Sequence, residues 1–335
     1  MSEYNIQMNK YNALNAGYDQ LYPATKIKNV DGLDTALQSK PNPNLLDNWY
    51  FGNPVNQRGQ TVYTSNAEAS VYSIDRWKIW GQYTSSDTLS LNDGYVTFNS
   101  NGHRYGGITT TIESAGLRGE TLTLSIFGRG RTTGRAAWLT VDSYDASDVQ
   151  TRICDTYINF DTIFSIIQRN GLVVPSNSVT LQIKMLSSND DGGIYDFKAI
   201  KLELGDTQTL AHQENGNWVL NEIPDYGEQL RRCQRYCFVW DYGNTSNSCL
   251  AVFQAYTATN AFGIIPTPVT LRANPVVSGG TLVAGGKTVT LTGITKCANG
   301  VRTIAVVSDG NLTVGQAVGI ENGNDNGRVV FSADL

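Results

Sequence analysis

Histidine and charge are the scarcest features of this sequence. Its 335 residues include two histidines, His103 and His212, and 16% of the residues are charged, with a net charge of −5. Neither histidine lies near a nucleophile motif or at a spacing that builds a metal site, which argues against histidine-based catalysis and bound zinc. A phosphate backbone is normally bound by a dense Lys/Arg surface, which this composition does not supply. We therefore expect no nucleic-acid partner.

Long apolar runs and paired cysteines are also missing. No run approaches the roughly 18 residues that a membrane-spanning helix needs, and Met1-Ser-Glu-Tyr-Asn lacks the basic and apolar regions of a signal peptide. We expect synthesis in a cytosol and no membrane insertion. The cysteines are odd in number and show no C-x-x-C spacing, which favours buried free thiols: Cys154, Cys233, Cys237, Cys249 and Cys297.

Alternating apolar and polar residues dominate the region between residues 44 and 205. Runs rich in β-branched and aromatic residues are separated by Gly, Asn and Asp turns, which is typical of a sandwich. About eight such strands over this length predict a two-sheet jelly roll. The clearest runs are 95–98, 107–112, 120–127, 137–141, 179–185 and 194–204.

Residues 1–43 form a separate N-terminal arm. Tyr11, Leu14 and Tyr18 recur at three- and four-residue steps, so the arm is predicted to be helical or to wrap a partner as an extended segment. A short apolar seam follows before Pro41, in which the residues stand at i, i+3 and i+7: Val30, Leu33 and Leu37. A helix this short gains little stability alone, so we expect it to meet copies of itself, with a solitary helix packed on its own chain as the alternative.

For residues 222–335 we expect a second, smaller β-rich domain with one helix. A linker over residues 206–221 is expected to precede it. Pro224 can occupy the first turn of that helix, and an apolar stripe follows at i, i+4, i+7 and i+11: Tyr226, Leu230, Cys233 and Cys237. The stripe explains Cys233 and Cys237 as core residues. Strands are expected at 250–253, 268–271, 288–292, 302–307 and 328–331.

Two acidic segments are the candidates for catalysis or for a metal. Glycoside hydrolysis needs two carboxylates placed across a bond, and carboxylates gather at Asp142–Asp148 and at Asn189–Gly193. Because both segments contain turn formers between strands, solvated loops are the favoured interpretation. A structural calcium ion is left open without assigned ligands, and no other metal or cofactor is expected.

Aromatic residues next to polar ones are the candidates for sugar binding, because rings can stack on a pyranose while polar groups bond its hydroxyls. We expect Trp77 and Trp138 to belong to the core. Trp240 and Tyr242 flank an Asn/Ser/Thr loop, which favours a surface position. The candidate glycan-binding residues are Trp80, Tyr83 and Tyr105 in the jelly roll, and Trp240, Tyr242, Asn244 and Tyr256 in the C-terminal domain.

Several segments resemble those of bacteriophage tail fibres, in the order expected for such a fibre. Asp31-Gly-Leu-Asp-Thr-Ala-Leu-Gln-Ser-Lys40 is similar to a short element that precedes their distal β-domain. The other segments resemble the start and end of carbohydrate-binding-module-like jelly rolls and the last domain of the same proteins: 44–49, 56–59, 72–77, 201–205, 227–236, 271–275 and 332–335. The resemblance implies a homotrimeric receptor-binding protein of the virion tail, made in the host bacterial cytoplasm.

The predicted function is therefore attachment of a particle to a bacterial surface polysaccharide without catalysis. The resemblance implies that the N-terminal arm binds a tail or baseplate protein. Multivalency would make weak single contacts useful. The alternatives are a tail-associated polysaccharide depolymerase, a fibre of a phage-tail-like bacteriocin or contractile injection particle, and a purely structural spacer.

Overall fold

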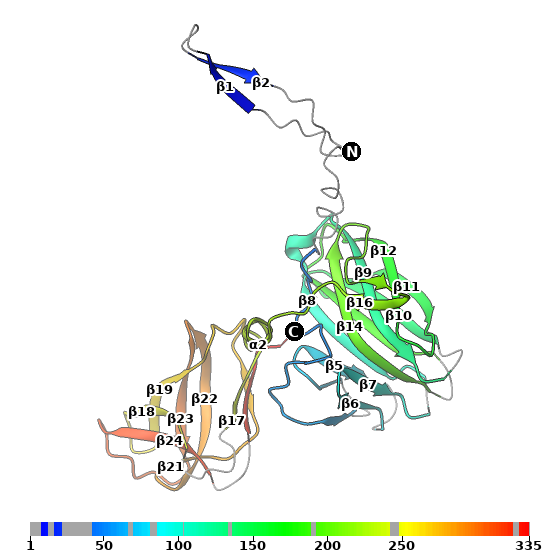
Figure 1. Ribbon diagram of the computed structural model, residues 1–335. Coiled ribbons are helices and arrows are strands. Elements are labelled where there is room, and N and C mark those ends of the chain that lie inside the picture. Colours follow the sequence, from blue (N-terminus) through cyan, green and yellow to red (C-terminus); the bar gives the residue numbers. More distant parts are fainter. Residues whose placement is uncertain are drawn as a thin grey trace. The chain divides into compact units, whose positions relative to one another are not determined.

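The computed structural model of the protein describes residues 8–12, 17–21, 42–65, 70–80, 86–102, 104–132, 136–188, 192–241, 248–323 and 328–334. The chain divides into two compact units, one of residues 1–43 with 209–222 and the other of residues 44–208 with 223–335. Figure 1 colours the elements along the sequence. The predicted seam of Val30, Leu33 and Leu37 lies outside the described residues.

The first unit contains two antiparallel hairpins. In one, β1 (Met8–Asn12) pairs with β2 (Gly17–Leu21). In the other, β15 (Ala211–Glu214) pairs with β16 (Asn217–Leu220). The described parts of the N-terminal arm are thus extended, which corrects the helical interpretation there, and the segment expected to be a linker includes a hairpin.

A β-sandwich of two six-stranded sheets follows, drawn in blue to green in Figure 1. One sheet has the order β11 (Gln150–Asn159), β10 (Ala136–Tyr144), β13 (Thr180–Ser187), β8 (Gly107–Glu113), β5 (Trp77–Trp80) and β4 (Val71–Tyr72). The other has the order β12 (Ser165–Val173), β9 (Thr121–Gly130), β14 (Ile194–Leu204), β7 (Tyr95–Asn99), β6 (Thr88–Asn92) and β3 (Val62–Thr64). A 3-10 turn, η2 (Ala115–Leu117), lies between β8 and β9.

The sandwich core is built from the alternation that the sequence shows. Leu124 and Ile126 on β9 and Leu139 on β10 are each at most 1% exposed. Trp77 is also 1% exposed, so its predicted core position is confirmed. The mainly β fold, with a sandwich followed by a smaller β-rich domain, is thereby confirmed.

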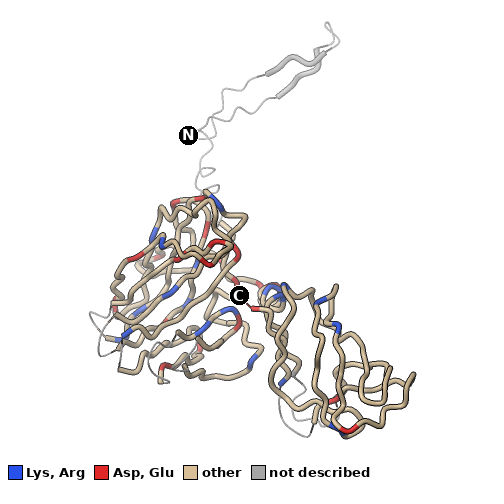
Figure 2. Tube along the Cα trace, turned by 180° about the vertical axis from the view of Figure 1, so that it is seen from behind, with Lys and Arg blue, Asp and Glu red and all other residues tan. Residues whose placement is uncertain are grey.

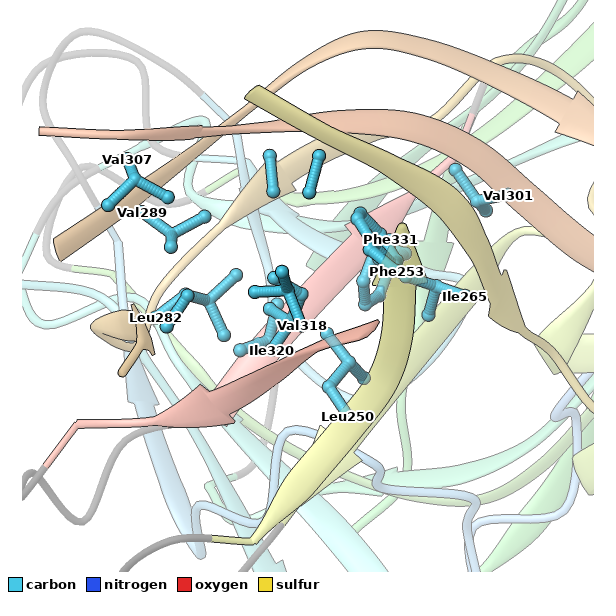
Figure 3. Close-up of a cluster of buried hydrophobic side chains, with 14 of the residues drawn as sticks. Leu250, Phe253, Ile265, Leu282, Val289, Val301, Val307, Val318, Ile320 and Phe331 are labelled. Atoms are coloured by element: carbon cyan, nitrogen blue, oxygen red, sulfur yellow. The ribbon is translucent and has the colours of Figure 1, made fainter. Parts of the chain in front are cut away.

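The C-terminal domain combines a closed six-stranded barrel with a three-stranded sheet and a helix. The barrel order is β18 (Cys249–Ala255), β19 (Asn260–Pro266), β23 (Gly300–Val307), β22 (Lys287–Cys297), β21 (Leu282–Ala284) and β24 (Ala317–Asn322). The sheet order is β17 (Cys237–Asp241), β25 (Arg328–Ser332) and β20 (Val276–Ser278). Figure 3 shows Phe253, Ile265 and Phe331 meeting inside, so the two systems share one core.

Two C-terminal predictions differ from the structure. Helix α2 (Tyr226–Gln234) begins after Asp225, whose side chain accepts a hydrogen bond from the Glu228 N–H at 2.8 Å, and Cys237 already opens strand β17. The helix is therefore shorter than the predicted stripe, although Cys233 and Cys237 are both buried as expected. The predicted strand at 268–271 is irregular, since the pairing of β19 ends at Pro266.

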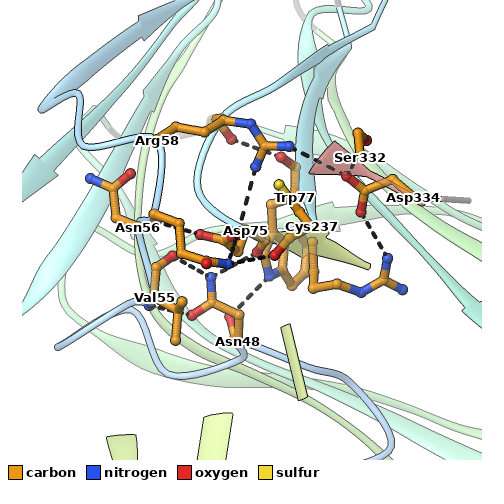
Figure 4. A network of polar contacts seen from close by, with 12 residues as sticks. Asn48, Val55, Asn56, Arg58, Asp75, Trp77, Cys237, Ser332 and Asp334 are labelled. Carbon is orange, nitrogen blue, oxygen red and sulfur yellow. Dashed lines mark hydrogen bonds and ion pairs between the residues drawn. The ribbon is translucent and has the colours of Figure 1, made fainter. Parts of the chain in front are cut away.

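A buried polar network joins the sandwich to the C-terminal domain. The Asp334 carboxylate lies 3.3 Å from Arg58 Nη2 and 3.4 Å from Arg76 Nη1. The Gln57 amide donates to the Cys237 carbonyl at 2.7 Å. Figure 4 shows Arg58 pointing at Asp334 from the sandwich side. A buried charge destabilises a fold unless an opposite charge compensates it, and Arg58, Arg76 and Asp334 each have such a partner.

The same interface contains a second ion pair and a cation–π contact. Asp47 lies 2.7 Å from Arg232 and 3.4 Å from Arg76. The Arg76 guanidinium stacks 3.5 Å from the centroid of the Tyr236 ring.

None of the helices in the described part of the chain is both long and apolar enough to cross a bilayer.

Candidate functional site

A row of aromatic side chains crosses the outer face of the sheet β11-β10-β13-β8-β5-β4. Directly opposed residues of an antiparallel pair point to the same face. Trp80 opposes Gly107, Gly107 opposes Leu186, Leu186 opposes Trp138, and Trp138 opposes Tyr157. The strand neighbours of the two tryptophans are buried in the sandwich core: Ile79, Ala137 and Leu139. Trp80 and Trp138 therefore both face outward, about 14 Å apart across three strand spacings.

Trp138 is the best fixed of these rings. Its indole N–H donates to the Asp155 carboxylate at 2.6 Å, and the Tyr105 ring meets it edge-on at 5.9 Å between centroids. The side chain is half-exposed. This corrects the expectation that Trp138 belongs to the core, because a residue between inward-facing Ala137 and Leu139 must point outward.

A buried carboxylate on the same strand as Trp138, four residues further along, holds two cations. Asp142 on β10 is fully buried, with Arg152 Nε 2.8 Å from Oδ1 and Lys184 Nζ 3.3 Å from Oδ2. Lys184 Nζ also lies 4.9 Å from the centroid of the Trp80 ring, and the Arg152 guanidinium lies 5.3 Å from that of Trp138. We call these six residues, Trp80, Trp138, Tyr157, Asp142, Arg152 and Lys184, the platform.

The Asp142 finding corrects an expectation. The segment Asp142–Asp148 was expected to be a solvated loop, and only Asp145–Asp148 forms a turn. Asp142 itself lies in a strand. Its hydrogen bond to Arg152 raises the pKa of that guanidinium further above its already high value.

A β-bulge places the charges of β11 on this face. Val141 pairs with Cys154 and Asp142 pairs with Arg152, so Ile153 is an extra residue in β11. In a regular strand Arg152 and Asp155, three positions apart, would point to opposite faces. The bulge brings both outward, where the Arg152 guanidinium lies 3.1 Å from the Asp155 carboxylate.

Two buried hydroxyls lie on either side of Lys184. Thr109 on β8 and Thr140 on β10 both oppose it and are each 1% exposed. Neither hydroxyl oxygen has a hydrogen-bond partner within the described residues. Buried hydroxyls usually have a partner, but at 1% exposure these two lie below the surface that an external ligand would contact.

The structure separates the predicted sugar-binding residues into two groups. Trp80 lies on the platform and Tyr105 at its edge against Trp138. Tyr256 lies in the C-terminal domain and is 44% exposed. Trp240 on β17 is half-buried and packs against the barrel core, which corrects its expected surface position. Tyr83, Tyr242 and Asn244 lie outside the described residues.

Sequence reasoning missed Trp138, Tyr157, Lys184 and Arg152 as site residues, and it considered Asp142 only as a catalytic or metal-binding carboxylate. The usable signal was the period-two pattern of residues 137–141, in which Ala137, Leu139 and Val141 alternate with more polar neighbours. No such signal marks Arg152, because the bulge at Ile153 breaks the alternation of β11.

The histidines and the possible metal ligands are the remaining candidates for chemistry. Among the described residues, no group of three or more His, Cys, Asp or Glu is placed to hold a metal ion. The imidazole Nδ1 of His212 on strand β15 lies 2.5 Å from the Asn221 side-chain oxygen, and His103 lies outside the described residues. The loop expected at Asn189–Gly193 is described only from residue 192 onward.

The sandwich is similar to carbohydrate-binding modules in solved structures. A family 4 module shares 16% sequence identity and covers 48% of this chain and 99% of its own, with a TM-score of 0.33. The C-terminal family 22 module of Clostridium thermocellum Xyn10B shares 8% identity and covers 49% and 96%, with a TM-score of 0.31. The CBM22-1 xylan-binding domain of Paenibacillus barcinonensis Xyn10C shares 11% identity and covers 50% and 98%, also with a TM-score of 0.31. No family model and no curated protein matches the sequence.

Proposed function

We propose that this chain is a receptor-binding protein of a bacteriophage tail fibre, and that it attaches the particle to a bacterial surface polysaccharide without cleaving it. The observation that carries the glycan part of this proposal is the platform. The Cα atoms of two outward tryptophans lie about 14 Å apart, and a buried carboxylate with its two cations lies on the same face of the sheet. A phage-tail-like bacteriocin or a contractile injection particle would use the same binding chemistry.

The platform suits a short stretch of a polysaccharide chain that runs across the strands. Indole rings offer flat apolar surface for the apolar face of a sugar ring. Arg152 and Lys184 offer donors for hydroxyl groups, and the exposed Asp155 carboxylate beside Trp138 offers acceptors.

The carboxylates of the platform support binding over hydrolysis. A glycosidase needs one carboxyl group whose raised pKa lets it act as a general acid. The hydrogen bond from Trp138, followed by that from Arg152, instead lowers the pKa of Asp155. Asp142 is fully buried beneath two cations. The environments of these two carboxylates therefore favour binding of a polysaccharide over its acid–base cleavage.

A binding assay with the full chain tests the proposal. Immobilised bacterial surface polysaccharide should retain the wild-type protein, and Trp138→Ala should weaken binding by about tenfold or more, as the loss of a central aromatic contact does. Trp218→Ala on β16 is the matched control, since this tryptophan lies outside the sandwich. Equal retention of both variants would remove the platform from the mechanism.

A second measurement separates adhesion from depolymerisation. Incubation with the same polysaccharide should release no reducing ends, and sustained release would replace the adhesin proposal with the enzyme alternative. Native mass measurement tests the fibre assembly, in which residues 30–37 join three chains and the N-terminal arm binds a tail or baseplate protein. A monomer at micromolar concentration would contradict the trimer.

A further inference from the structure

A groove of about 520 Å³ lies on the outside of the C-terminal barrel, apart from the platform. It runs over β19, β23 and β22. Phe262 opposes Ile304, which opposes Thr292, and the next row is Ile264, Arg302 and Thr295. The alternate residues point inward and are buried: Ala261, Ile265, Val301, Thr303 and Ala305.

Aromatic rings form one side of this groove. Tyr256 and Phe262 are 44% and 43% exposed, and their ring centroids lie 6.4 Å apart in an edge-on arrangement. Ile264 extends the apolar surface and is 55% exposed. Exposed aromatic and aliphatic side chains gathered on one face of a barrel are typical of an interaction site.

A glycine bulge shapes the opposite side. Thr292 opposes Ile304 and Thr295 opposes Arg302, so β22 holds two residues where β23 holds one. Gly293 has a φ of +60°, a conformation that other residues adopt only with strain. The bulge turns Thr295 outward beside Arg302, which places a hydroxyl and a guanidinium on the same rim.

The guanidinium of Arg302 makes no ion pair or hydrogen bond with any described residue. Charged side chains are few on this domain (Figure 2), and the other described cations of the barrel and its adjoining segments are engaged. Lys287 pairs with Asp309, Arg272 pairs with Glu113, and Lys296 donates to a backbone carbonyl. An exposed, unpaired guanidinium beside aromatic rings gives this groove a net positive charge in a chain whose overall charge is −5.

We propose that this groove binds a uronic acid residue of an acidic polysaccharide, as a second glycan site of the chain. One guanidinium presents a planar fork that matches one planar carboxylate. Tyr256 and Phe262 supply the surface for the apolar face of the sugar ring, and Thr295 supplies a hydroxyl for its polar edge. The single positive charge fits a sugar carboxylate, and the site does not depend on the platform.

Calorimetric titration of the full chain with oligogalacturonate tests this site, with neutral galactan oligomers and a sugar phosphate as comparison probes. Arg302→Gln should weaken oligogalacturonate binding by about tenfold or more, and Arg302→Lys should restore part of it. Lys287→Gln, which removes the same charge from the same barrel, should bind like the wild type. Tyr256→Ala should also weaken binding, because it removes one of the two rings.

Trp138→Ala keeps this proposal distinct from the platform. It should leave oligogalacturonate binding unchanged, so a chain without platform activity can still show the second site. Binding that survives Arg302→Gln, or that is equally strong for the neutral oligomers, would overturn the assignment. Preference for the sugar phosphate over oligogalacturonate would overturn the uronic acid class.

Discussion

The contacts of Asp334 lead to the sharpest prediction on stability. Its side chain is 4% exposed and meets Arg58, which is 15% exposed, and Arg76, which is 2% exposed. Asp334→Asn removes the charge that both cations face but leaves Arg58 near Asp75 at 3.8 Å and Arg76 near Asp47 at 3.4 Å. The cost should therefore be smaller than that of orphaning a buried ion and larger than that of an exposed pair. We expect a loss of about 2 kcal/mol, the range of hydrogen bonds to charged groups.

Differential scanning calorimetry and urea denaturation measure this loss. For the compact unit that contains this interface, residues 44–208 with 223–335, about 2 kcal/mol lowers Tm by about 3 °C. Asp309→Asn is the control, because its partner Lys287 is exposed and the pair should contribute about 0.5 kcal/mol or less. If the two variants unfold alike, the buried contacts of Asp334 contribute nothing and the reasoning fails.

A local probe reports on the same interface. Cys237 lies beside this network, and its burial raises the pKa of the thiol to about 12. Because the thiolate is the reactive form, alkylation of Cys237 should require opening of the interface. Asp334→Asn should accelerate that alkylation, as followed by mass spectrometry, whereas Asp309→Asn should not.

Three further predictions concern buried and exposed titratable groups. Burial raises the pKa of the Asp75 carboxyl. Its stabilising contribution is therefore fully present below the unfolded-state pKa and is lost as the pH rises through the folded-state pKa. Denaturation measured from pH 4 to 7 should show the wild type losing stability relative to Asp75→Asn, and the opposite trend would contradict this. Backbone hydrogen bonds from Val149 and Ser147 lower the pKa of the Asp145 carboxyl. Its contribution to folding stability is therefore present above the unfolded-state pKa and is lost as the pH falls through the folded-state pKa. In Asp145→Asn, this loss of stability on acidification should be absent from the same denaturation series. Iodoacetamide should label the exposed Cys249 in the native protein well before Cys233, which is buried, and equal labelling rates would refute the burial.

Strong alternation made much of the sandwich predictable. Residues 107–112 and 194–204 were predicted as strands, and the structure has β8 at Gly107–Glu113 and β14 at Ile194–Leu204. Strands β11 and β12 were not predicted, because these two strands are at the edge of their sheets and are largely exposed. A strand without a fully buried face carries little alternation in its sequence.

The site was harder to predict than the fold, and Trp138 shows why. A tryptophan in a strand is usually assigned to the core by residue type, whereas its orientation depends on which neighbours point inward. Asp142 and Lys184 form an ion pair because β10 pairs with β13, although the two residues are 42 positions apart along the chain. No local sequence pattern reveals this pairing. Trp80 and Tyr105 were selected from the sequence only as aromatic residues next to polar ones, and the structure places Trp80 on the platform and Tyr105 at its edge against Trp138.

The extra residue in β11 ties the charges of the platform to one local irregularity. Deleting Ile153 would leave Arg152 directly before Cys154 and still opposite Asp142, so the ion pair would survive in regular pairing. If the bulge closed with Ile153 retained, Arg152 and the residues before it would each shift by one position and turn toward the opposite face. Asp142 would then lose a cation and Trp138 the guanidinium beside it. Substitutions that favour or disfavour the bulge are thus a simple way to change this face, with the two-sheet scaffold left intact.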